Sequence, residues 1–360
     1  MVQLSSIWLK YTVSTGFYKA PGARFTVRKV FLLDKTTLDR GFVDSLPPEK
    51  TFPSGGTTEI GNGLLGFSPK IASKYFYDAK GSALFERITR LPEYYPTRTE
   101  RSILVHDGPK IAHRLAEHLG GVDTVIEPGA GNCEKAAFLC DLLQPERYVG
   151  VDISGEFIHR AGAELRRACP GLDVQTVTGD ITADISLPAD LPASRRLVFY
   201  PGSSIGNFDP TEAVALMARM RRLAGDEGAL LIGVDLVKDT GVLEAAYNDA
   251  AGVTAAFNLN ILDHVNTLIG SDFRTRQWRH RAFFNRAQSR IEMHLEARSA
   301  LKVRWPGAER VFAVGESIHT ENSYKYRVGD FARLLAKAGF AHHEHWTDER
   351  GWFAVVLARP

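Results

Sequence analysis

From about Thr124 onward, short apolar runs alternate with amphipathic stretches along the chain. Four of these runs have the length and composition of strands, at residues 124–127, 148–152, 197–200 and 229–235. Strands that alternate with helices build a parallel sheet covered by helices. The pattern therefore predicts an α/β fold.

One predicted helix shows both of its ends in the sequence. Asp209 is suited to the N-cap, Pro210 to the first helical position, and Glu212 completes a capping box three residues after the cap. Gly225 is expected to end the helix. Its apolar face consists of Ala213, Leu216, Met217 and Met220.

After the fourth predicted strand the alternation stops. Residues 242–268 are expected to be helical, and residues 290–297 alternate like an antiparallel strand. A helix around residues 330–338 and a hairpin over residues 343–357, with its turn at 348–351, are expected to follow. The chain is therefore predicted to hold an inserted domain between two pieces of one core.

Composition narrows the class of protein. A chain of 360 residues with 44% hydrophobic content can bury a large core. Its 44 basic and 42 acidic residues leave a net charge of +2, which does not indicate nucleic-acid binding. No run approaches the roughly 18 consecutive apolar residues that cross a membrane. We expect a soluble protein with neither nucleic acid nor membrane as partner.

The cysteines and the N-terminal residues indicate in which cellular compartment the protein is expected. Cys133, Cys140 and Cys169 contain no C-x-x-C pair, which argues against a disulfide framework and a zinc site and favours the reducing cytoplasm. The first 33 residues are basic and lack Asp and Glu, as in some transit peptides. Because termini are often disordered, we favour an N-terminal extension over residues 1–60, disordered in part, or a start assigned too early.

A glycine-containing turn follows the first predicted strand. Gly129 and Gly131 let the backbone turn sharply and approach a ligand without Cβ atoms. Asp152 ends the next strand, where a carboxylate can accept both hydroxyls of a ribose, and Asp180 is suited to an adenine amino group. A Gly-x-Gly turn alone can be purely structural. Together these residues predict a nucleoside cofactor at the carboxyl ends of the strands.

Two nucleoside cofactors compete for this turn. The turn that binds NAD carries a third glycine, and Glu134 stands at that position here. A carboxylate would repel the pyrophosphate of NAD, whereas the sulfonium and amino-acid tail of S-adenosylmethionine (SAM) tolerate it. We therefore favour SAM over NAD.

Two long motifs resemble those of a known enzyme family. They are Tyr75-Phe-Tyr77-Asp78-Ala-Lys-Gly81-Ser82-Ala-Leu-Phe85 and Leu91-Pro-Glu-Tyr94-Tyr95-Pro-Thr97-Arg98-Thr-Glu100. From about Ser68 to its C-terminus the chain is similar to the histidine Nα-methyltransferases of ergothioneine biosynthesis, which convert L-histidine to its trimethylammonium betaine, hercynine. Further matching segments are residues 201–207, 235–239, 247, 252–258, 290–293 and 320–325.

The resemblance implies a class I SAM-dependent methyltransferase, with a Rossmann-like α/β core around a seven-stranded sheet and a second, smaller α+β domain. The C-terminal hairpin would close that sheet. The implied SAM-binding core comprises residues 98–236 and 325–360, and the implied substrate-binding domain comprises residues 61–97 and 237–324. We expect a cytoplasmic monomer.

The resemblance also assigns residues to the two ligands. One family example carries Phe at the position of Ile181, so this chain lacks an aromatic neighbour for adenine there. The residues implied around SAM are Tyr77, Gly129, Gly131, Lys135, Asp152, Asp180 and Ile181. Those implied around L-histidine are Tyr94, Gly202, Asn207, Tyr247, Met293, Glu321 and Ser323.

Glu321 and Ser323 are two residues apart, so on an extended segment their side chains point to the same face. A carboxylate acceptor beside a hydroxyl donor can satisfy the N–H and the bare nitrogen of a neutral imidazole. Spacing alone favours an ordinary solvated edge strand, and the resemblance favours recognition of the histidine side chain. Met293 shares a strand face with Ile291 and Leu295, which by itself indicates core packing.

Catalysis is expected to depend on positioning. Methyl transfer from a sulfonium is an in-line displacement that needs no strong acid, but it needs a deprotonated amine held about 3–3.5 Å from the methyl carbon. We expect Tyr94, Asn207 and Tyr247 to hold the substrate, or the tyrosines to accept a proton through water. For isolated tyrosines, core packing is the alternative role.

No metal is expected, because His343 and His345 could share one face of a strand but have no third ligand in view. Two other functions stay open. The same fold could methylate another amino acid or an aromatic amine. Alternatively, the chain could bind SAM or an amino acid without catalysis.

Overall fold

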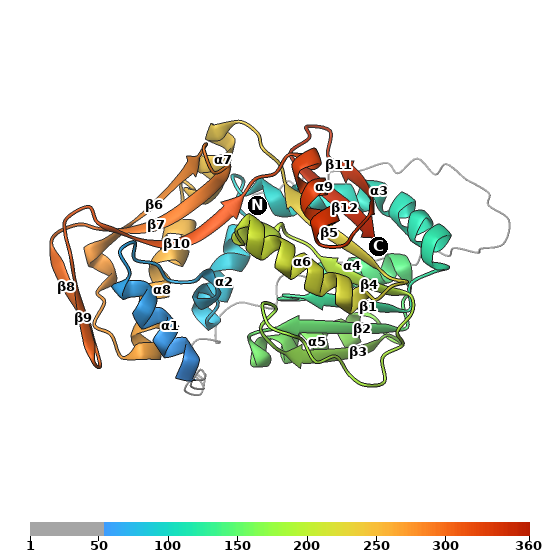
Figure 1. Ribbon diagram of the computed structural model, residues 1–360, viewed down its shortest axis with the longest axis horizontal. Coiled ribbons are helices and arrows are strands. Elements are labelled where there is room, and N and C mark those ends of the chain that lie inside the picture. The colour runs from blue at the N-terminus through green and yellow to red at the C-terminus, as the bar shows by residue number, and fades with distance from the viewer. Residues whose placement is uncertain (1–53) are drawn as a thin grey trace, which may run out of the picture. The chain divides into compact units, whose positions relative to one another are not determined.

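The computed structural model describes residues 54–360, which are coloured in Figure 1. The first 33 residues, whose composition is that of some transit peptides, lie outside this range, and so does most of the predicted N-terminal extension over residues 1–60. The last part of that extension is helical, because helix α1 (Ser54–Leu65) begins inside it.

Seven strands form one sheet in the order β11-β12-β5-β4-β1-β2-β3. The first five in chain order pair in parallel, and the last two form an antiparallel hairpin whose second strand pairs with β5. This confirms the predicted α/β fold, its four predicted strands and the C-terminal hairpin. The strands are β1 (Thr124–Pro128), β2 (Arg147–Asp152), β3 (Asp173–Thr178), β4 (Arg196–Tyr200), β5 (Ala229–Asp235), β11 (His342–Thr347) and β12 (Phe353–Arg359).

Strand β3 has no counterpart among the predicted strands. It lies at the edge of the sheet, and Val174 is its one buried residue. Parallel strands in the middle of a sheet are buried on both faces and form continuous apolar runs, whereas this edge strand has the mostly polar sequence DVQTVT. The apolar pattern therefore missed it.

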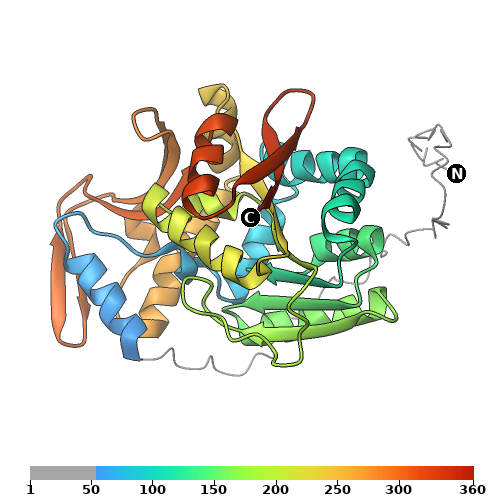
Figure 2. The same ribbon diagram turned by 45° about the vertical axis from the view of Figure 1, so that its right-hand side comes forward.

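Helices cover both faces of this sheet (Figures 1 and 2). Helices α3 (Tyr95–Leu119), α4 (Glu134–Leu143) and α5 (Gly155–Ala168) share one buried apolar cluster with the strands. Helices α6 (Pro210–Ala224) and α9 (Val328–Lys337) share another cluster on the opposite face. This two-sided covering is the reason that the central strands carry unbroken apolar runs.

The predicted ends of helix α6 are confirmed. The Asp209 side chain accepts hydrogen bonds from the backbone N–H groups of Thr211 and Glu212, and the Glu212 side chain accepts one from the Asp209 N–H. This capping box satisfies donors that the first helical turn leaves without partners. Gly225 is the C-cap, as predicted.

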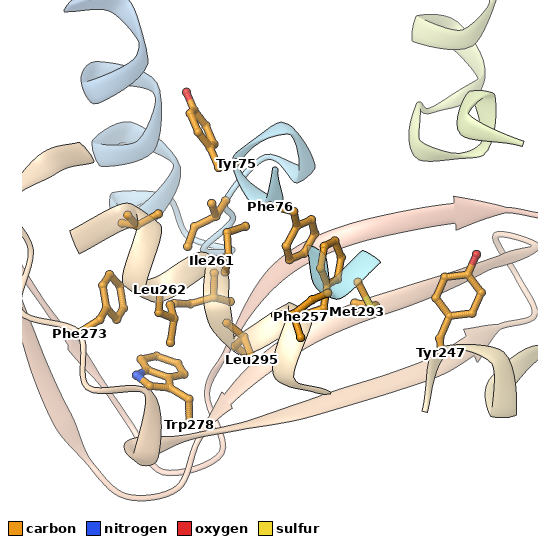
Figure 3. Packing of buried hydrophobic residues seen from close by; sticks show 14 of the residues in the cluster. Tyr75, Phe76, Tyr247, Phe257, Ile261, Leu262, Phe273, Trp278, Met293 and Leu295 are labelled. Carbon is orange, nitrogen blue, oxygen red and sulfur yellow. The ribbon is translucent and has the colours of Figure 1, made fainter. Parts of the chain in front are cut away.

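A second, antiparallel sheet has the order β10-β7-β6, and its strands are β6 (Trp278–Asn285), β7 (Arg290–Ala297) and β10 (Ser317–Tyr324). Strand β7 confirms the predicted antiparallel strand. One buried cluster joins this sheet to nearby helices, and Figure 3 shows part of it. The remaining elements here are η2 (Ser73–Phe76), α2 (Ala79–Ile88), α7 (Thr240–Tyr247), α8 (Val253–Ile269), η4 (Thr275–Gln277), β8 (Leu301–Trp305) and β9 (Ala308–Phe312).

Most of residues 242–268 is helical, as predicted, but the helical region is divided into the separate helices α7 and α8. Asp249 stands between them and accepts hydrogen bonds from the N–H groups of Val253 and Thr254, which start α8. Gly252 directly precedes α8 with φ +69°, a conformation that favours glycine. Residues 248–252 have the sequence Asn-Asp-Ala-Ala-Gly, whose Asn, Asp and Gly are typical of such a break.

The predicted division into a SAM-binding core and a substrate-binding domain stays a prediction. Within residues 54–360, no helix combines the length and apolarity that crossing a membrane requires.

Candidate active site

A pocket lies where strands β7 and β10 meet the loop after β4 and the start of α3. All seven residues that the sequence places around histidine line it, and so does Tyr77, which the sequence places near SAM. The other lining residues are Phe85, Ile88, Pro96, Ser203, Ser204, Asp235, Ala246, Thr254 and Phe257.

Glu321 and Ser323 lie on β10 and both point into this pocket, next to Met293 on the paired strand β7. The Glu321 Oε1 accepts a hydrogen bond of 3.3 Å from the amide of Asn207, which ends the short helix η3 (Ser204–Asn207). Burial raises the pKa of Glu321 to about 7, although the charge of Lys325 opposes the rise. The carboxyl therefore changes its charge near neutral pH.

Tyr94 and Tyr247 both line the pocket and their rings contact edge to face, with ring centroids 6.2 Å apart. Burial, together with nearby acidic groups that include Glu321, raises the pKa of both phenols well above the usual range. Both hydroxyls therefore stay protonated at neutral pH. This favours a role as hydrogen-bond partners over a role as ionised bases.

Met293 packs next to Phe257 in the apolar part of the pocket wall (Figure 3). Its side chain belongs to the same buried cluster as Ile291 and Leu295, so the core-packing interpretation of the strand is compatible with its place in the pocket. An unbranched thioether adapts its shape to a flat ring.

A buried charged cluster lies beside the pocket and was not predicted. It consists of Tyr95, Asp235, Lys238 and Lys325, which we call the Asp235 cluster. The Lys325 Nζ lies 2.8 Å from Asp235 Oδ2, and the Tyr95 hydroxyl donates a hydrogen bond to the same oxygen. Burial raises the pKa of Asp235, but the charges of Lys325 and Lys238 outweigh it and hold this pKa below its usual value.

The position of Asp235 carries a signal that could have revealed this cluster. Asp235 directly ends the fully buried strand β5, and an acid in such a place is costly unless a cation accompanies it. The partners that compensate it, however, come from other parts of the chain, so the sequence alone does not identify them.

At the cofactor end, the glycine turn packs against the end of β2. Gly129 and Gly131 have φ values of +70° and +55°. The Gly131 N–H donates a hydrogen bond of 3.1 Å to Asp152, whose other carboxylate oxygen accepts one from the Ser154 N–H. Burial raises the pKa of Asp152, and these backbone bonds oppose the rise.

The end of β3 brings a second acidic residue to the same edge. Gly179 donates its N–H to the carbonyl of Asp152, which holds the next residue, Asp180, at this end of the sheet. The Asp180 carboxylate accepts hydrogen bonds from the N–H and hydroxyl of Thr182, and Ile181 packs partly buried against the cluster around α6. Two carboxylates beside a turn that admits close approach fit the ribose and adenine of a nucleoside cofactor.

Lys135 lies between the cofactor end and the pocket. Its Nζ pairs at 2.5 Å with Glu100, a fully buried residue of α3, and the other Glu100 oxygen accepts a 2.8 Å bond from the Gly202 N–H. A side chain at Gly233 would collide with Glu100, so β5 leaves room for this carboxylate. The sequence did not predict the role of Glu100 as a link.

Within residues 54–360, no three His, Cys, Asp or Glu side chains lie close enough together to hold one metal ion. His343 and His345 lie on β11, at the far edge of the large sheet.

Comparison with known proteins identifies the family. The model of the family described as histidine-specific, SAM-dependent methyltransferases matches residues 57–360. This chain belongs to that family. The family model matches this methyltransferase from residue 57 onward, whereas the sequence motifs indicated a resemblance only from about Ser68.

Curated relatives cover most of this methyltransferase. It is 40% identical to the histidine N-alpha-methyltransferase of Mycolicibacterium smegmatis over 309 residues, which are 83% of this chain and 93% of that protein. It is 35% identical to the enzyme of the same name from Mycobacterium tuberculosis over 307 residues, with the same coverage. It is 30% identical to ergothioneine biosynthesis protein 1 of Neurospora crassa over 79% of this chain and 32% of that protein.

These findings confirm the predicted family, an enzyme of the methyltransferase class and SAM as its cofactor. The NAD alternative is wrong. The roles of the individual site residues stay predictions. Tyr77 lines the pocket together with the seven residues assigned to histidine, and the other residues assigned to SAM lie outside this lining.

Proposed function

We propose that this methyltransferase transfers methyl groups to the α-amino group of L-histidine, three times in succession, and so forms hercynine in the first step of ergothioneine biosynthesis. The observation that carries the proposal is the buried pair of Glu321 and Ser323, side by side in a pocket with Asn207. Bound SAM supplies the methyl group on a positively charged sulfur.

Recognition of the imidazole is assigned to this pair. The ionised Glu321 accepts the imidazole N–H, and the pair of hydroxyls on Ser323 and Tyr247, which lie 2.7 Å apart, supplies a donor for the bare nitrogen. An amino acid without these groups would leave buried polar atoms unpaired at about 1–3 kcal/mol each, so we expect its rejection by tenfold or more. Met293 packs against the ring.

The main-chain groups of histidine are assigned to the other side of the pocket. Asn207 already donates to Glu321 through its amide nitrogen, which points its amide oxygen away as an acceptor for the α-amino group. We assign the protonated Tyr94 hydroxyl as donor to the α-carboxylate, and Gly202, which lines the same pocket, as a neighbour without a side chain. Holding a neutral amine in line with the methyl group accounts for much of the rate of such a displacement.

Residues of the cofactor end hold SAM in this proposal. Asp152 accepts the ribose hydroxyls, Asp180 accepts the adenine amino group, and the Lys135 ammonium balances the carboxylate of the amino-acid tail. Tyr77, which lines the pocket, is assigned to the side of the pocket that SAM would contact.

Mass spectrometry tests the proposal directly. The purified protein is incubated with SAM and the twenty amino acids, and we expect histidine alone to gain the mass of three methylene units on its α-nitrogen. Gain on another amino acid would keep the enzyme class and overturn the pocket assignment. No product despite measurable SAM binding would favour the non-catalytic alternative.

We also propose that the enzyme acts as a cytoplasmic monomer. The three cysteines are free thiols, which suits a reducing compartment. Sedimentation velocity at micromolar concentration tests the monomer, and a stable dimer would overturn it.

A further inference from the structure

Lys325 has three ammonium protons and three polar partners. Its Nζ lies 2.8 Å from Asp235 Oδ2, 2.8 Å from Ser323 Oγ and 3.1 Å from the Tyr247 hydroxyl, and the residue is 3% exposed. An ammonium group can only donate hydrogen bonds. Both hydroxyl oxygens therefore accept from Lys325, and neither can turn its own proton toward the lysine.

This arrangement limits what the two hydroxyls can offer a ligand. Tyr247 and Ser323 lie 2.7 Å apart, so one of them donates its proton to the other. One proton then remains for the pocket, whichever of the two donates inward. The pair acts as one donor, opposite the acceptor Glu321 on the same strand.

We propose that Lys325 is a positioning residue for substrate recognition, which fixes the Tyr247–Ser323 pair as a single donor opposite Glu321 and so sets the preference for a ring with one acceptor and one donor nitrogen. The inference rests on the proposed histidine methylation. It deepens that function, because it explains how two adjacent hydroxyls present a defined pattern instead of rotating freely. Lys325 itself contacts no substrate.

Lys238 provides a matched control. It is a second buried lysine on the same carboxylate, since its Nζ pairs with Asp235 Oδ1, and its side chain is 3% exposed. Its other partners are the Tyr95 hydroxyl and the Leu236 carbonyl, and neither is a member of the Tyr247–Ser323 pair. Removing either lysine therefore deprives Asp235 of one cation. Only the removal of Lys325 also takes a hydrogen-bond donor from Tyr247 and Ser323.

The first experiment compares Lys325→Met with Lys238→Met. For Lys325→Met we expect the KM for histidine to rise at least tenfold while the Kd for SAM changes less than twofold. For Lys238→Met we expect a KM change below threefold. Equal KM changes in the two variants would overturn the inference, and so would an unchanged KM in a folded Lys325→Met protein.

A second experiment avoids the charge change, in case Lys325→Met does not fold. In a double-mutant cycle, Tyr247→Phe and Ser323→Ala should be strongly non-additive, with the double variant at least tenfold worse than the product of the two single losses, because either hydroxyl alone can still donate its proton to the pocket. Additive losses would overturn the inference.

The pH profile separates positioning from general loss of structure. Burial raises the pKa of Glu321, and Lys325 is the charge that opposes it, while Tyr77, Tyr94, Tyr247 and the Asn207 amide also face this carboxyl. Lys325→Met should move the acid limb of histidine binding to higher pH, and an unmoved limb would count against the inference. If the wild-type protein makes no methylated histidine, the proposed function fails instead, and the kinetic comparison loses its premise.

Discussion

The cofactor end of the site and the histidine pocket differ in the atoms that make their contacts. At the cofactor end, carboxylates accept hydrogen bonds from backbone N–H groups of nearby turns, such as Asp152 from Gly131 and Ser154. In the pocket, side chains far apart in the sequence contact each other, such as Asn207 with Glu321, 114 residues away. The first kind of site is preformed by the sheet edge, and the second exists only when the two sheets are packed together.

This difference has a consequence for substitutions. A change at the cofactor end removes contacts to one ligand and leaves backbone turns in place. A change in the pocket also removes a partner from several other side chains, so its effect spreads through the buried network. We therefore expect larger losses on the histidine side.

The largest effect is expected for Glu321→Ala. The variant loses the imidazole acceptor and leaves Asn207 without its partner, and a few kcal/mol of lost recognition correspond to a fall in kcat/KM for histidine of about 100-fold. Calorimetry should find the Kd for SAM within twofold of wild type. Glu309→Ala, an exposed carboxylate on β9, is the control. Equal losses of histidine use and SAM affinity would contradict the assignment of Glu321.

Asp152→Ala should have the next largest effect, on the other ligand. Loss of two ribose contacts, at about 1 kcal/mol each, corresponds to a Kd for SAM roughly 30-fold higher. At saturating SAM the KM for histidine should change little. Fluorescence titration measures the Kd, and unchanged SAM affinity in a folded variant would remove the ribose assignment.

The two regions were also unequally accessible from the sequence. Gly129, Gly131 and Asp152 follow predicted strands in chain order, and parallel topology alone brings such residues to one edge. The pocket residues were placed together by family resemblance, since periodicity alone favoured an ordinary strand for Glu321 and Ser323. The packing of β10 against the loop after β4 determines which residues lie next to Glu321 and Ser323.

Glu100 and Lys325 show why the rest was missed. Each stands inside a recognised motif, but its function depends on partners contributed by separate elements. Burial of a charge is a tertiary property, and local pattern does not report it. Strand β3 was missed for the opposite reason. An edge strand needs few apolar residues, so β3 lacks the apolar run by which the other strands were predicted.

Glu100→Gln tests the connection between the two regions and should have a smaller effect. The amide keeps an oxygen for the Gly202 N–H but removes the charge that holds Lys135. We expect both SAM affinity and histidine affinity to fall about fivefold, since one ion-pair partner of a buried pair is lost. Asp107→Asn, also buried on α3 and paired with Lys110, is the control. An effect on one ligand alone would show that Glu100 does not join the two ends.

The pH dependence of histidine binding sharpens the assignment of the pocket. The pKa of Glu321 is about 7, so the carboxyl is protonated below this pH and ionised above it. The ionised form accepts the imidazole N–H, and histidine affinity in the presence of S-adenosylhomocysteine should therefore rise severalfold as pH increases through about 7. Glu321→Gln should keep only the part that comes from titration of histidine itself. An identical pH profile in that variant would contradict the expectation.

The smallest effect concerns stability at the cofactor end. Burial raises the pKa of Glu127, at the end of β1, from 4.5 to about 8, against the Tyr148 hydrogen bond and the Lys135 charge. Because the folded-state pKa lies above the unfolded value, the contribution to stability is complete below pH 4.5 and is lost as pH rises toward 8. Glu127→Gln keeps a neutral group at every pH. Relative to wild type, its Tm should therefore be several degrees higher at pH 8 than at pH 5, because this pKa difference corresponds to a few kcal/mol of stability across that pH range. A pH-independent difference in Tm would show that Glu127 is ionised in the folded protein, and the cofactor end would then hold a buried charge like the one in the Asp235 cluster.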